Sequence, residues 1–568
     1  MTPSSSIRLI DRVAKSVGRE AANRWWNLAE QTHRQALGGD PWPVVQMLDK
    51  RAVEEPQSPL APAYHLWAAD ALARVAQDRD ALTRYDRVIS AADGAPPFER
   101  IDFPNEALRQ RAPILTRLGD IDAAIASYRE LEARGEKGSL YLAGVTAELA
   151  GRFDEAESIY RETGASDRGP DAHDPAQRAL RGAERLANKV GPFTSSAKDI
   201  ARLVEDALRS RDIAALRRLA SSTHFQAGPG GGHFRFETND VLEHLCADLH
   251  RSRPTRIHPG LLGTGDKRYL LTTGWRGEWF EHIVGFYFAR SGRGWEWQGL
   301  VVNAPAHPWV ERWTTKEPRT NQALTLPLLA PWPEGRYFMA GGLSVFLLQA
   351  AELAALAWIP FIGAGLAAAR ALIFSLTRCG FGLRGFYYNV GPTHDGDNAF
   401  AIDFTSYQRG VPLLNISGGT RVLSPADGIV RWSRGHVPSG ADWQVNEVQI
   451  DHDDPVTGNP RYVTRYLHLA GPGKVLVSTA MPAPTGRRLG YMNDTGTSVI
   501  DHLHFSIHDT TLGPGIGPSV RPSPMDGQTL GDGDSGKCLR STNRETIVLP
   551  PGCGAIVVEL FRRLFGGR

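Results

Sequence analysis

Two stretches in the first third of the chain repeat each other. ILTRLGDIDAAIASYRELEA and TAELAGRFDEAESIYRETGA align at a spacing of 32 residues, so that Gly119 matches Gly151 and Tyr128 matches Tyr160. Both carry apolar residues at helical spacing. Small residues at fixed offsets let two antiparallel helices approach closely, and the tyrosine fills the gap between them. The repeat therefore predicts that residues 1–190 form an array of helix pairs, each burying its apolar face against its neighbours.

A looser copy of the pattern lies upstream, where Ala81 and Tyr85 take the equivalent places. Over about residues 60–165 the pattern resembles the tetratricopeptide repeat, whose period is about 34 residues. The resemblance implies a concave surface that binds another protein or a neighbouring domain. A plain helical bundle is the alternative.

The hydrophobic period changes after residue 195. Two short amphipathic helices, KDIARLVEDALRSRD and IAALRRLASS, precede the alternating, aromatic-rich segments KRYLLTTGW, WFEHIVGFYFAR and GWEWQGLVV. Alternation of this kind is typical of strands. The pattern predicts a small α+β domain over residues 195–303, with its helices first and a meander after. It is faintly similar to the cone-shaped fold of nuclear-transport-factor-like proteins, and it offers no convincing set of acid, base and nucleophile.

A Pro-rich linker is predicted over residues 304–342, and an apolar helical segment over 343–376. Seventeen residues without a charge run from Leu353 to Ala369, and Pro360 interrupts them. Such a run lies at the lower limit for a membrane span. The segment is expected to dock as a helical hairpin or to associate with a membrane, with docking slightly favoured.

Three pieces of residues 380–512 bring chemically useful side chains into strand-like surroundings. THDGDNAFAIDF contains His394 and Asp403, TRYLHL contains His468, and HLHF contains His502 and His504. Residues i and i+2 of a strand share a face, so the last two histidines point the same way. A carboxylate and paired imidazoles on a sheet face are costly without a partner, and a metal ion removes that cost.

These pieces resemble the lysostaphin-type zinc endopeptidases, which have the duplicated hybrid motif fold. The resemblance rests on AIDF, TRVLSPADGIV, YLHL and GTSVIDHLHF, and no ligand is missing. It implies that zinc is held by His394, Asp403 and His504, with His468 and His502 catalytic. It further implies a metalloendopeptidase that cuts peptide bonds, mostly in peptidoglycan stems or cross-bridges.

The chemistry of these residue types agrees with that division. Two imidazoles and one carboxylate leave the fourth tetrahedral position of zinc open for water. Zinc lowers the pKa of that water toward ~7 and polarises a scissile carbonyl. Two further histidines then accept the water's proton and stabilise the oxyanion.

Several alternatives remain open at this level. Asp397 competes with Asp403 as the carboxylate ligand. It lies in a Gly-Asp-Asn loop, which favours a solvated side chain. His436, His452 and His508 are interpreted as surface or satisfied core residues, and His508 in particular as solvated. Two histidines and a carboxylate also form the iron site of non-haem oxygenases. The alternative function is a non-catalytic scaffold or degenerate activator that binds a protein through its repeats.

Composition limits the classes of binding partner and the cellular locations that we expect. Lys and Arg total 64 against 62 Asp and Glu, a net charge of +2, so nucleic acid is not expected as a partner. Four cysteines are too few for a disulfide scaffold, although Cys538 and Cys553 are spaced for one late disulfide. Charges interrupt every apolar run near the N-terminus, which predicts no secretory signal peptide. We therefore expect a bacterial protein that is cytoplasmic or exported by a non-standard route.

Together these patterns predict a multidomain α+β chain. An N-terminal α-helical repeat array is followed by a small α+β domain and by a C-terminal, mostly antiparallel β peptidase domain. Residues 513–568 are expected to form a tail that ends in an amphipathic helix.

Overall fold

The computed structural model describes residues 3–92, 96–164, 179, 183, 193–220, 226–228, 245–250, 254–261, 266–277, 281–291, 294–302, 326–331, 337–340, 401–406, 419–438, 444–496, 502–513, 515–520, 525–526, 538–541 and 543–545.

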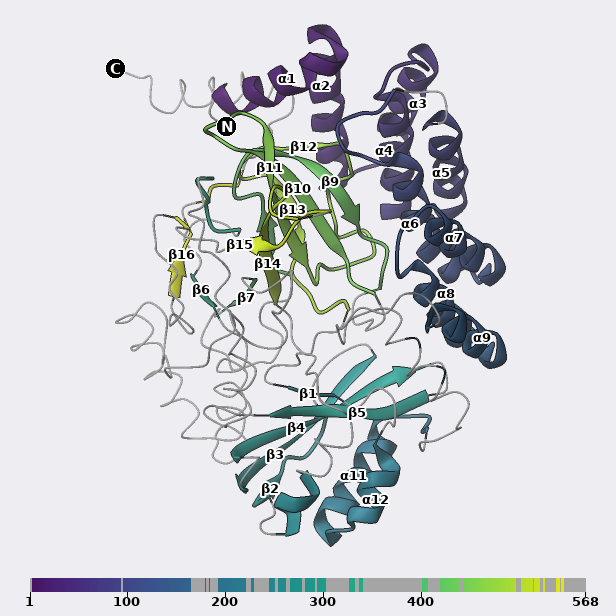
Figure 1. Cartoon of the computed structure of the whole chain (residues 1–568), viewed down its shortest axis with the longest axis vertical. Helices are drawn as coiled ribbons and strands as arrows, with labels where there is room; N and C mark the ends of the chain where they lie inside the picture. Colours follow the sequence, from purple (N-terminus) through teal and green to yellow (C-terminus); the bar gives the residue numbers. More distant parts are fainter. Residues whose placement is uncertain are drawn as a thin grey trace, which may run out of the picture.

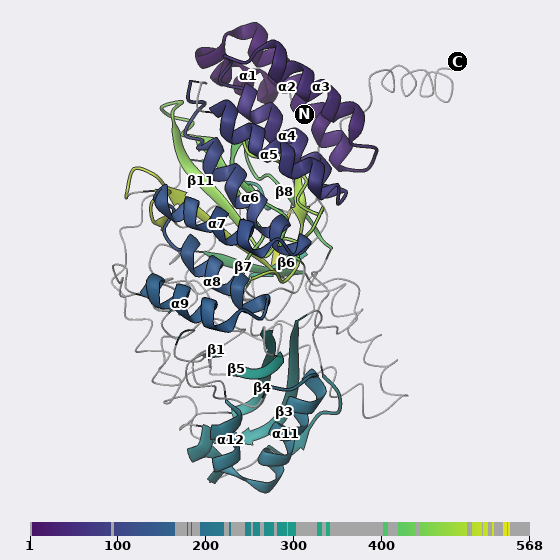
Figure 2. The ribbon, with the colours of Figure 1, turned by 90° about the vertical axis from the view of Figure 1, so that its right-hand side faces the viewer.

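The first part of the chain, residues 3–164, is a helical array. Consecutive helices contact each other along the array (Figure 2). The helices are α1 (Pro3–Val17), α2 (Arg19–Ala36), α3 (Trp42–Glu54), α4 (Ala61–Arg74), α5 (Asp78–Ala92), α6 (Phe103–Leu118), α7 (Ile121–Ala133), α8 (Ser139–Leu149) and α9 (Phe153–Gly164).

The repeated residues of the array have two different roles. Tyr128 and Tyr160 are buried, as expected of residues that fill the gap between helices. Gly119 and Gly151 instead follow the ends of α6 and α8 with φ near +80°, where a Cβ would meet no atom within 4 Å. They terminate helices, because glycine adopts this left-handed conformation at little cost. Close approach occurs at Gly144, where a Cβ would lie 2.4 Å from the Tyr160 ring.

In the middle domain, residues 193–302, two helices precede the sheet, and residues 245–250 form a further short helical segment between its first two strands. Helices α11 (Ala197–Ser210) and α12 (Ile213–Leu219) pack on a sheet of order β1-β5-β4-β3-β2, in which β3, β4 and β5 form an antiparallel meander. The strands are β1 (Gln226–Gly228), β2 (Arg256–Ile257), β3 (Lys267–Arg276), β4 (Glu281–Ser291) and β5 (Gly294–Val302).

The C-terminal domain, by which we mean the described residues between 326 and 545, contains a larger sheet of order β12-β9-β10-β11-β14-β7-β6-β16, with β15 beside β14. Strands β8 and β13 pair separately. The strands are β6 (Tyr337–Ala340), β7 (Ile402–Ser406), β8 (Arg421–Leu423), β9 (Gly428–Arg434), β10 (Glu447–Asp453), β11 (Pro460–Leu467), β12 (Pro482–Ala483), β13 (Arg488–Tyr491), β14 (Leu503–Asp509), β15 (Ser519–Val520) and β16 (Cys538–Arg540).

Two pieces of chain that the sequence places outside this domain contribute to its sheet. Strand β6 comes from the stretch interpreted as a Pro-rich linker, and it pairs with β7. Strand β16 comes from the expected tail, and it pairs with β6. Leu326 and Leu328, also from the linker stretch, are buried in the core. Proline content marks turns and loops, and it does not exclude short strands between them.

The central strands of this sheet have one apolar and one polar face. Val448, Tyr466 and Phe505 are fully buried on the apolar face. Glu447 and His504 alternate with them along β10 and β14 and are therefore on the other face. The sheet thus separates a hydrophobic core from a layer of polar side chains.

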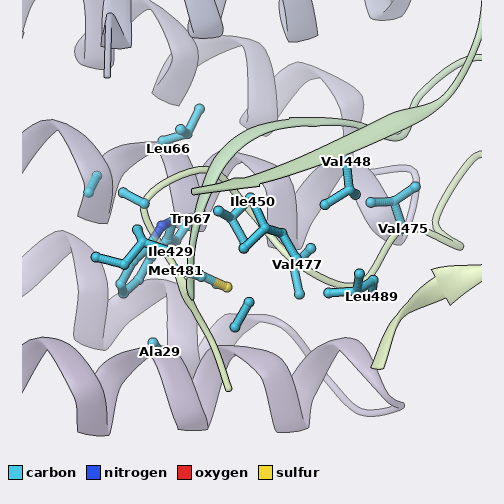
Figure 3. Packing of buried hydrophobic residues seen from close by; sticks show 14 of the residues in the cluster. Ala29, Leu66, Trp67, Ile429, Val448, Ile450, Val475, Val477, Met481 and Leu489 are labelled. Atoms are coloured by element: carbon cyan, nitrogen blue, oxygen red, sulfur yellow. The ribbon is translucent and has the colours of Figure 1, made fainter. Parts of the chain in front are cut away.

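The helical array covers the apolar side of the C-terminal domain. A single hydrophobic cluster joins helices α1 to α6 to the sheet and to the segment that follows β11. Within it, Trp67 of α4 lies beside Ile429 of β9 and Met481 (Figure 3). The Trp67 indole Nε1 also donates a hydrogen bond to the Thr479 carbonyl, at 2.8 Å.

Further polar contacts fix the same segment to the array. Trp25 of α2 donates from Nε1 to the Ala480 carbonyl at 2.9 Å. Arg74 at the end of α4 donates to the Val475 carbonyl and to the Ser478 hydroxyl, at 3.0 and 2.7 Å. Of the two expected uses of the array, contact with a neighbouring domain is therefore present within the chain itself. The array runs along one side of the sheet, and the middle domain lies at the end away from α1 and α2 (Figure 1).

Several predicted segments lie outside the described residues. They include the apolar segment 343–376, the terminal helix of the tail, and Cys379 and Cys553. Among the helices that are described, none is long and apolar enough to cross a membrane.

Candidate active site

Two of the three predicted metal ligands are backbone neighbours in the sheet. Strand β7 pairs antiparallel with β14, and Asp403 and His504 are register partners. The chain runs through 96 residues, 407–502, between the end of β7 and the start of β14, so only the sheet brings these two positions together.

Three imidazoles gather next to this strand pair. The ring of His468 lies 4.4 Å from that of His502 and 6.1 Å from that of His504, measured between centroids. All three residues are buried, with 9%, 8% and 6% of their surface exposed. They come from the end of β11, from an isolated bridge with Asn493, and from β14. The structure thus brings together both predicted catalytic histidines and one predicted ligand.

The orientation of His468 is fixed by its own backbone and by one hydrogen bond. Its φ of 63° lies in the left-handed region, which costs a residue with a side chain about 1–2 kcal/mol. Its Nδ1 lies 2.6 Å from the carbonyl oxygen of Thr495. A carbonyl only accepts, so Nδ1 carries the hydrogen, and Nε2 of the neutral ring is an acceptor. That is the tautomer that a general base needs.

The donor set fits zinc in kind. The residue types at His504 and at its register partner Asp403, an imidazole and a carboxylate, are both among the ordinary ligands of zinc. The third predicted ligand, His394, lies outside the described residues, as does the competing Asp397. Among the residues that are described, no group of three His, Cys, Asp or Glu side chains is placed to hold a metal ion.

Polar side chains continue along the same face of the sheet, and they were not among the site residues predicted from the sequence. Arg465 of β11 is the register partner of Ser506, two residues beyond His504. Its Nε donates to the buried carboxylate of Glu447 at 2.5 Å. Burial alone would raise the pKa of Glu447, but Arg465, Arg434 and Gln449 together outweigh it and lower that pKa. The alternation in NEVQID and TRYLHL was the available signal that these charges share the face of His504.

The predicted role of His452 as a satisfied core residue agrees with its surroundings. It is fully buried, with Nδ1 2.9 Å from the Asp427 carbonyl and Nε2 2.7 Å from the Thr464 hydroxyl. His436 is likewise buried, and its Nε2 lies 3.1 Å from the hydroxyl of Tyr85 in α5. The His452 ring therefore serves packing within the C-terminal domain, and the His436 ring also contacts the helical array.

The expectation that His508 is solvated is wrong. It is 1% exposed, and its ring nitrogens contact the Ser506 hydroxyl and the Gly517 carbonyl, both at 2.9 Å. The reason is that β14 continues past the histidine pair, and β15 then pairs with its far end. Burial lowers the pKa of His508 to about 4.

Acid should destabilise this domain through His452. Burial lowers its pKa to about 4 in the folded protein, against about 6.5 in the unfolded chain. As pH falls, the unfolded chain binds the proton first. The stabilisation from His452 is therefore complete above pH 6.5 and is lost progressively toward pH 4. At pH 5 the loss should be about 2 kcal/mol.

Chemical denaturation of wild type and His452→Gln at pH 7.5 and pH 5.0 measures this effect. The variant should lose about 2 kcal/mol less than wild type over that interval. His250→Gln, at an exposed position of the middle domain, is the matched control and should follow wild type. Equal losses in wild type and His452→Gln would contradict the prediction.

Comparison with known proteins assigns a class to this domain. Residues 406–514 match the description Peptidase family M23. The chain therefore carries a peptidase M23 domain, and the resemblance to lysostaphin-type peptidases is confirmed over these residues. The match includes His468, His502 and His504, and it begins after His394 and Asp403.

Similar solved structures cover parts of the chain. A zinc-containing peptidase from Vibrio cholerae is 28% identical over 21% of this chain, with a TM-score of 0.15, and this chain spans only 28% of its length. The catalytic domain of the antimicrobial peptidase lysostaphin from Staphylococcus simulans is 21% identical, covering 22% of this chain and 76% of that one, with a TM-score of 0.16. A tetratricopeptide repeat protein from Parabacteroides merdae is 18% identical, covering 34% of this chain and 70% of that one, with a TM-score of 0.23. No curated protein matches the chain.

Proposed function

We propose that the C-terminal domain is a zinc-dependent metalloendopeptidase. The observation that carries the proposal is the cluster of three buried imidazoles, His468, His502 and His504, beside the Asp403 position of β7. In this proposal His394, Asp403 and His504 hold the metal. The M23 match supports the peptidase class. The proposed ligand set also includes His394 and Asp403, which lie before the matched residues.

Each remaining histidine has a task set by its geometry. Bound zinc would supply a water of pKa ~7 and a Lewis acid for the scissile carbonyl. His468 takes a proton at Nε2, because Nδ1 is engaged by the Thr495 carbonyl. His502, 4.4 Å from it between ring centroids, is placed to hold or return a proton on the same side of the sheet. The burial of both rings strengthens their electrostatic effect on developing charge.

The substrate class proposed is the peptide part of peptidoglycan. The support is the resemblance of the motifs to lysostaphin-type enzymes, together with the M23 match over residues 406–514.

Hydrolysis of purified peptidoglycan and of a glycine-rich peptide tests the function. We expect cleavage that stops with a chelator, returns when zinc is added, and is absent in His504→Ala. Metal analysis of protein purified without added metal separates zinc from the iron of a non-haem oxygenase. Cleavage that survives both the chelator and His504→Ala would rule out the proposed zinc mechanism.

A non-catalytic scaffold is the competing function, and the contacts of the array bear on it. Helices α1 to α6 share a core with the C-terminal domain, so that surface is occupied inside the chain. A protein partner would therefore bind the array elsewhere. A folded protein that holds no zinc and cleaves neither substrate would favour the scaffold.

A further inference from the structure

One side chain of the middle domain reaches the loop that orients His468. Lys267, at the start of β3, is 1% exposed. Its ammonium group donates to the Asp494 carbonyl at 2.5 Å and also to the Gly496 carbonyl. A buried ammonium is expensive unless its hydrogens are bonded, so these contacts specify where the loop must lie.

The carbonyl between those two is the one that engages the catalytic ring. The Thr495 carbonyl accepts from His468 Nδ1 at 2.6 Å. The Lys267 ammonium therefore holds the peptide groups on both sides of that acceptor. If the loop turned, the acceptor would move away from Nδ1, and the ring would lose both its tautomer and its direction.

The loop is also tied to the other histidine of the proposed pair. Asn493 donates from its backbone N–H to the His468 carbonyl at 2.8 Å, and its own carbonyl accepts from the His502 N–H at 3.2 Å. A displacement of residues 493–496 would thus reach both His468 and His502. Neither is expected to bind the metal, so zinc would remain in place.

The far side of the loop is fixed by the C-terminal domain itself. The Thr495 hydroxyl donates to the Leu469 carbonyl and accepts from the Asn446 N–H, at 2.8 and 3.0 Å. A Cβ on Gly496 would lie 2.7 Å from the Cβ of Val445, so the loop packs closely there. These contacts hold the loop in place, but they do not fix the direction of the carbonyls on either side of Thr495. Lys267 fixes that direction.

We propose that Lys267 is a positioning residue for hydrolysis, through which the middle domain holds the 493–496 loop and keeps His468 Nε2 directed at the reacting water. This inference rests on the proposed function, in which His468 acts on that water. It gives the middle domain a part in catalysis, although none of the residues described in that domain is assigned a catalytic role.

The test uses the full chain with Lys267→Met, which keeps the stem of the side chain and removes its charge and donors. Turnover should fall about 10- to 100-fold, because a catalytic group is misplaced and not lost. KM should change less than about threefold and zinc content should stay near wild type, while the melting temperature should fall because two buried carbonyls lose their donor. Lys198→Met, at an exposed position of α11 in the same domain, is the matched control and should equal wild type.

A double-mutant cycle with His468→Ala separates positioning from a general structural effect. If Lys267 acts mainly through His468, adding Lys267→Met to His468→Ala should lower turnover by clearly less than the about 10- to 100-fold expected in wild type, and the remaining loss reflects His502. An equal loss in both backgrounds would overturn the proposal, and so would wild-type turnover in Lys267→Met. Should Lys267→Met not fold, Lys267→Gln, which keeps a neutral donor, is measured in the same cycle with the same criteria.

The same experiment distinguishes the two levels of inference. If His468→Ala alone leaves turnover unchanged, the proposed mechanism fails, and the role of Lys267 fails with it. If His468→Ala lowers turnover while Lys267→Met does not, only the role of Lys267 is wrong. A labelled-histidine NMR spectrum adds an independent readout, since the Nδ1–H signal of His468 should shift in Lys267→Met and stay unchanged in Lys198→Met.

Discussion

His504→Ala should lose zinc and peptide hydrolysis together, whereas His468→Ala should keep its zinc and lose turnover by about 10²–10⁴-fold. The physical reason is the place of each ring. His504 is the register partner of Asp403 on adjacent strands, where two ligands can share one ion. His468 lies 6.1 Å from His504 between ring centroids, with Nδ1 already bonded to Thr495. Zinc content by mass spectrometry and hydrolysis rates on the same preparations measure the difference.

His508→Ala is the informative control for this pair. His508 shares the strand of His504 and is equally buried, but its two nitrogens contact Ser506 and Gly517. Its removal leaves those partners unsatisfied, so the variant should lose about 1–3 kcal/mol of stability and keep its zinc. Loss of zinc from folded His468→Ala to the same extent as from His504→Ala would overturn the division of roles.

Part of the candidate site could be predicted from the sequence, because strand alternation is a local signal. HLHF already requires that His502 and His504 point the same way. The same alternation continues through Ser506 to His508, and following it would have shown that His508 shares the buried strand. The resemblance added His468, which no spacing rule connects to the pair.

The contacts between domains could not be predicted in this way. Hydrophobic periodicity tells which face of an element is buried, but it does not tell against what. Trp67 and Thr479 are 412 positions apart, and Lys267 and Asp494 are 227 apart. Such pairs are fixed by the shapes of finished domains. For the same reason, strand β6 could not be predicted inside a Pro-rich stretch. It is fixed by its pairing with β7 and β16, which are distant in the sequence.

Trp67→Ala should be the most destabilising single change in the shared core of the array and the C-terminal domain, costing about 3–5 kcal/mol. Trp67 is fully buried in α4, in the cluster that contains Ile429 and Met481 (Figure 3). The change opens a cavity of nearly indole size between the two domains. It also removes the donor of the Thr479 carbonyl. Chemical denaturation of the full chain, followed by tryptophan fluorescence, measures the loss.

Trp42→Ala is the matched control, because Trp42 begins α3 with 37% of its surface exposed. Its ring faces the guanidinium of Arg84, so a loss of about 0.5–1 kcal/mol is expected. Trp67→Phe separates the contribution of packing from that of the hydrogen bond, since it keeps most of the packing and removes the N–H donor. Because Thr479 belongs to the segment between β11 and β12, Trp67→Ala should also loosen that segment and expose it to protease. Equal stability and equal protease resistance in Trp67→Ala and Trp42→Ala would mean that the array does not stabilise the peptidase domain.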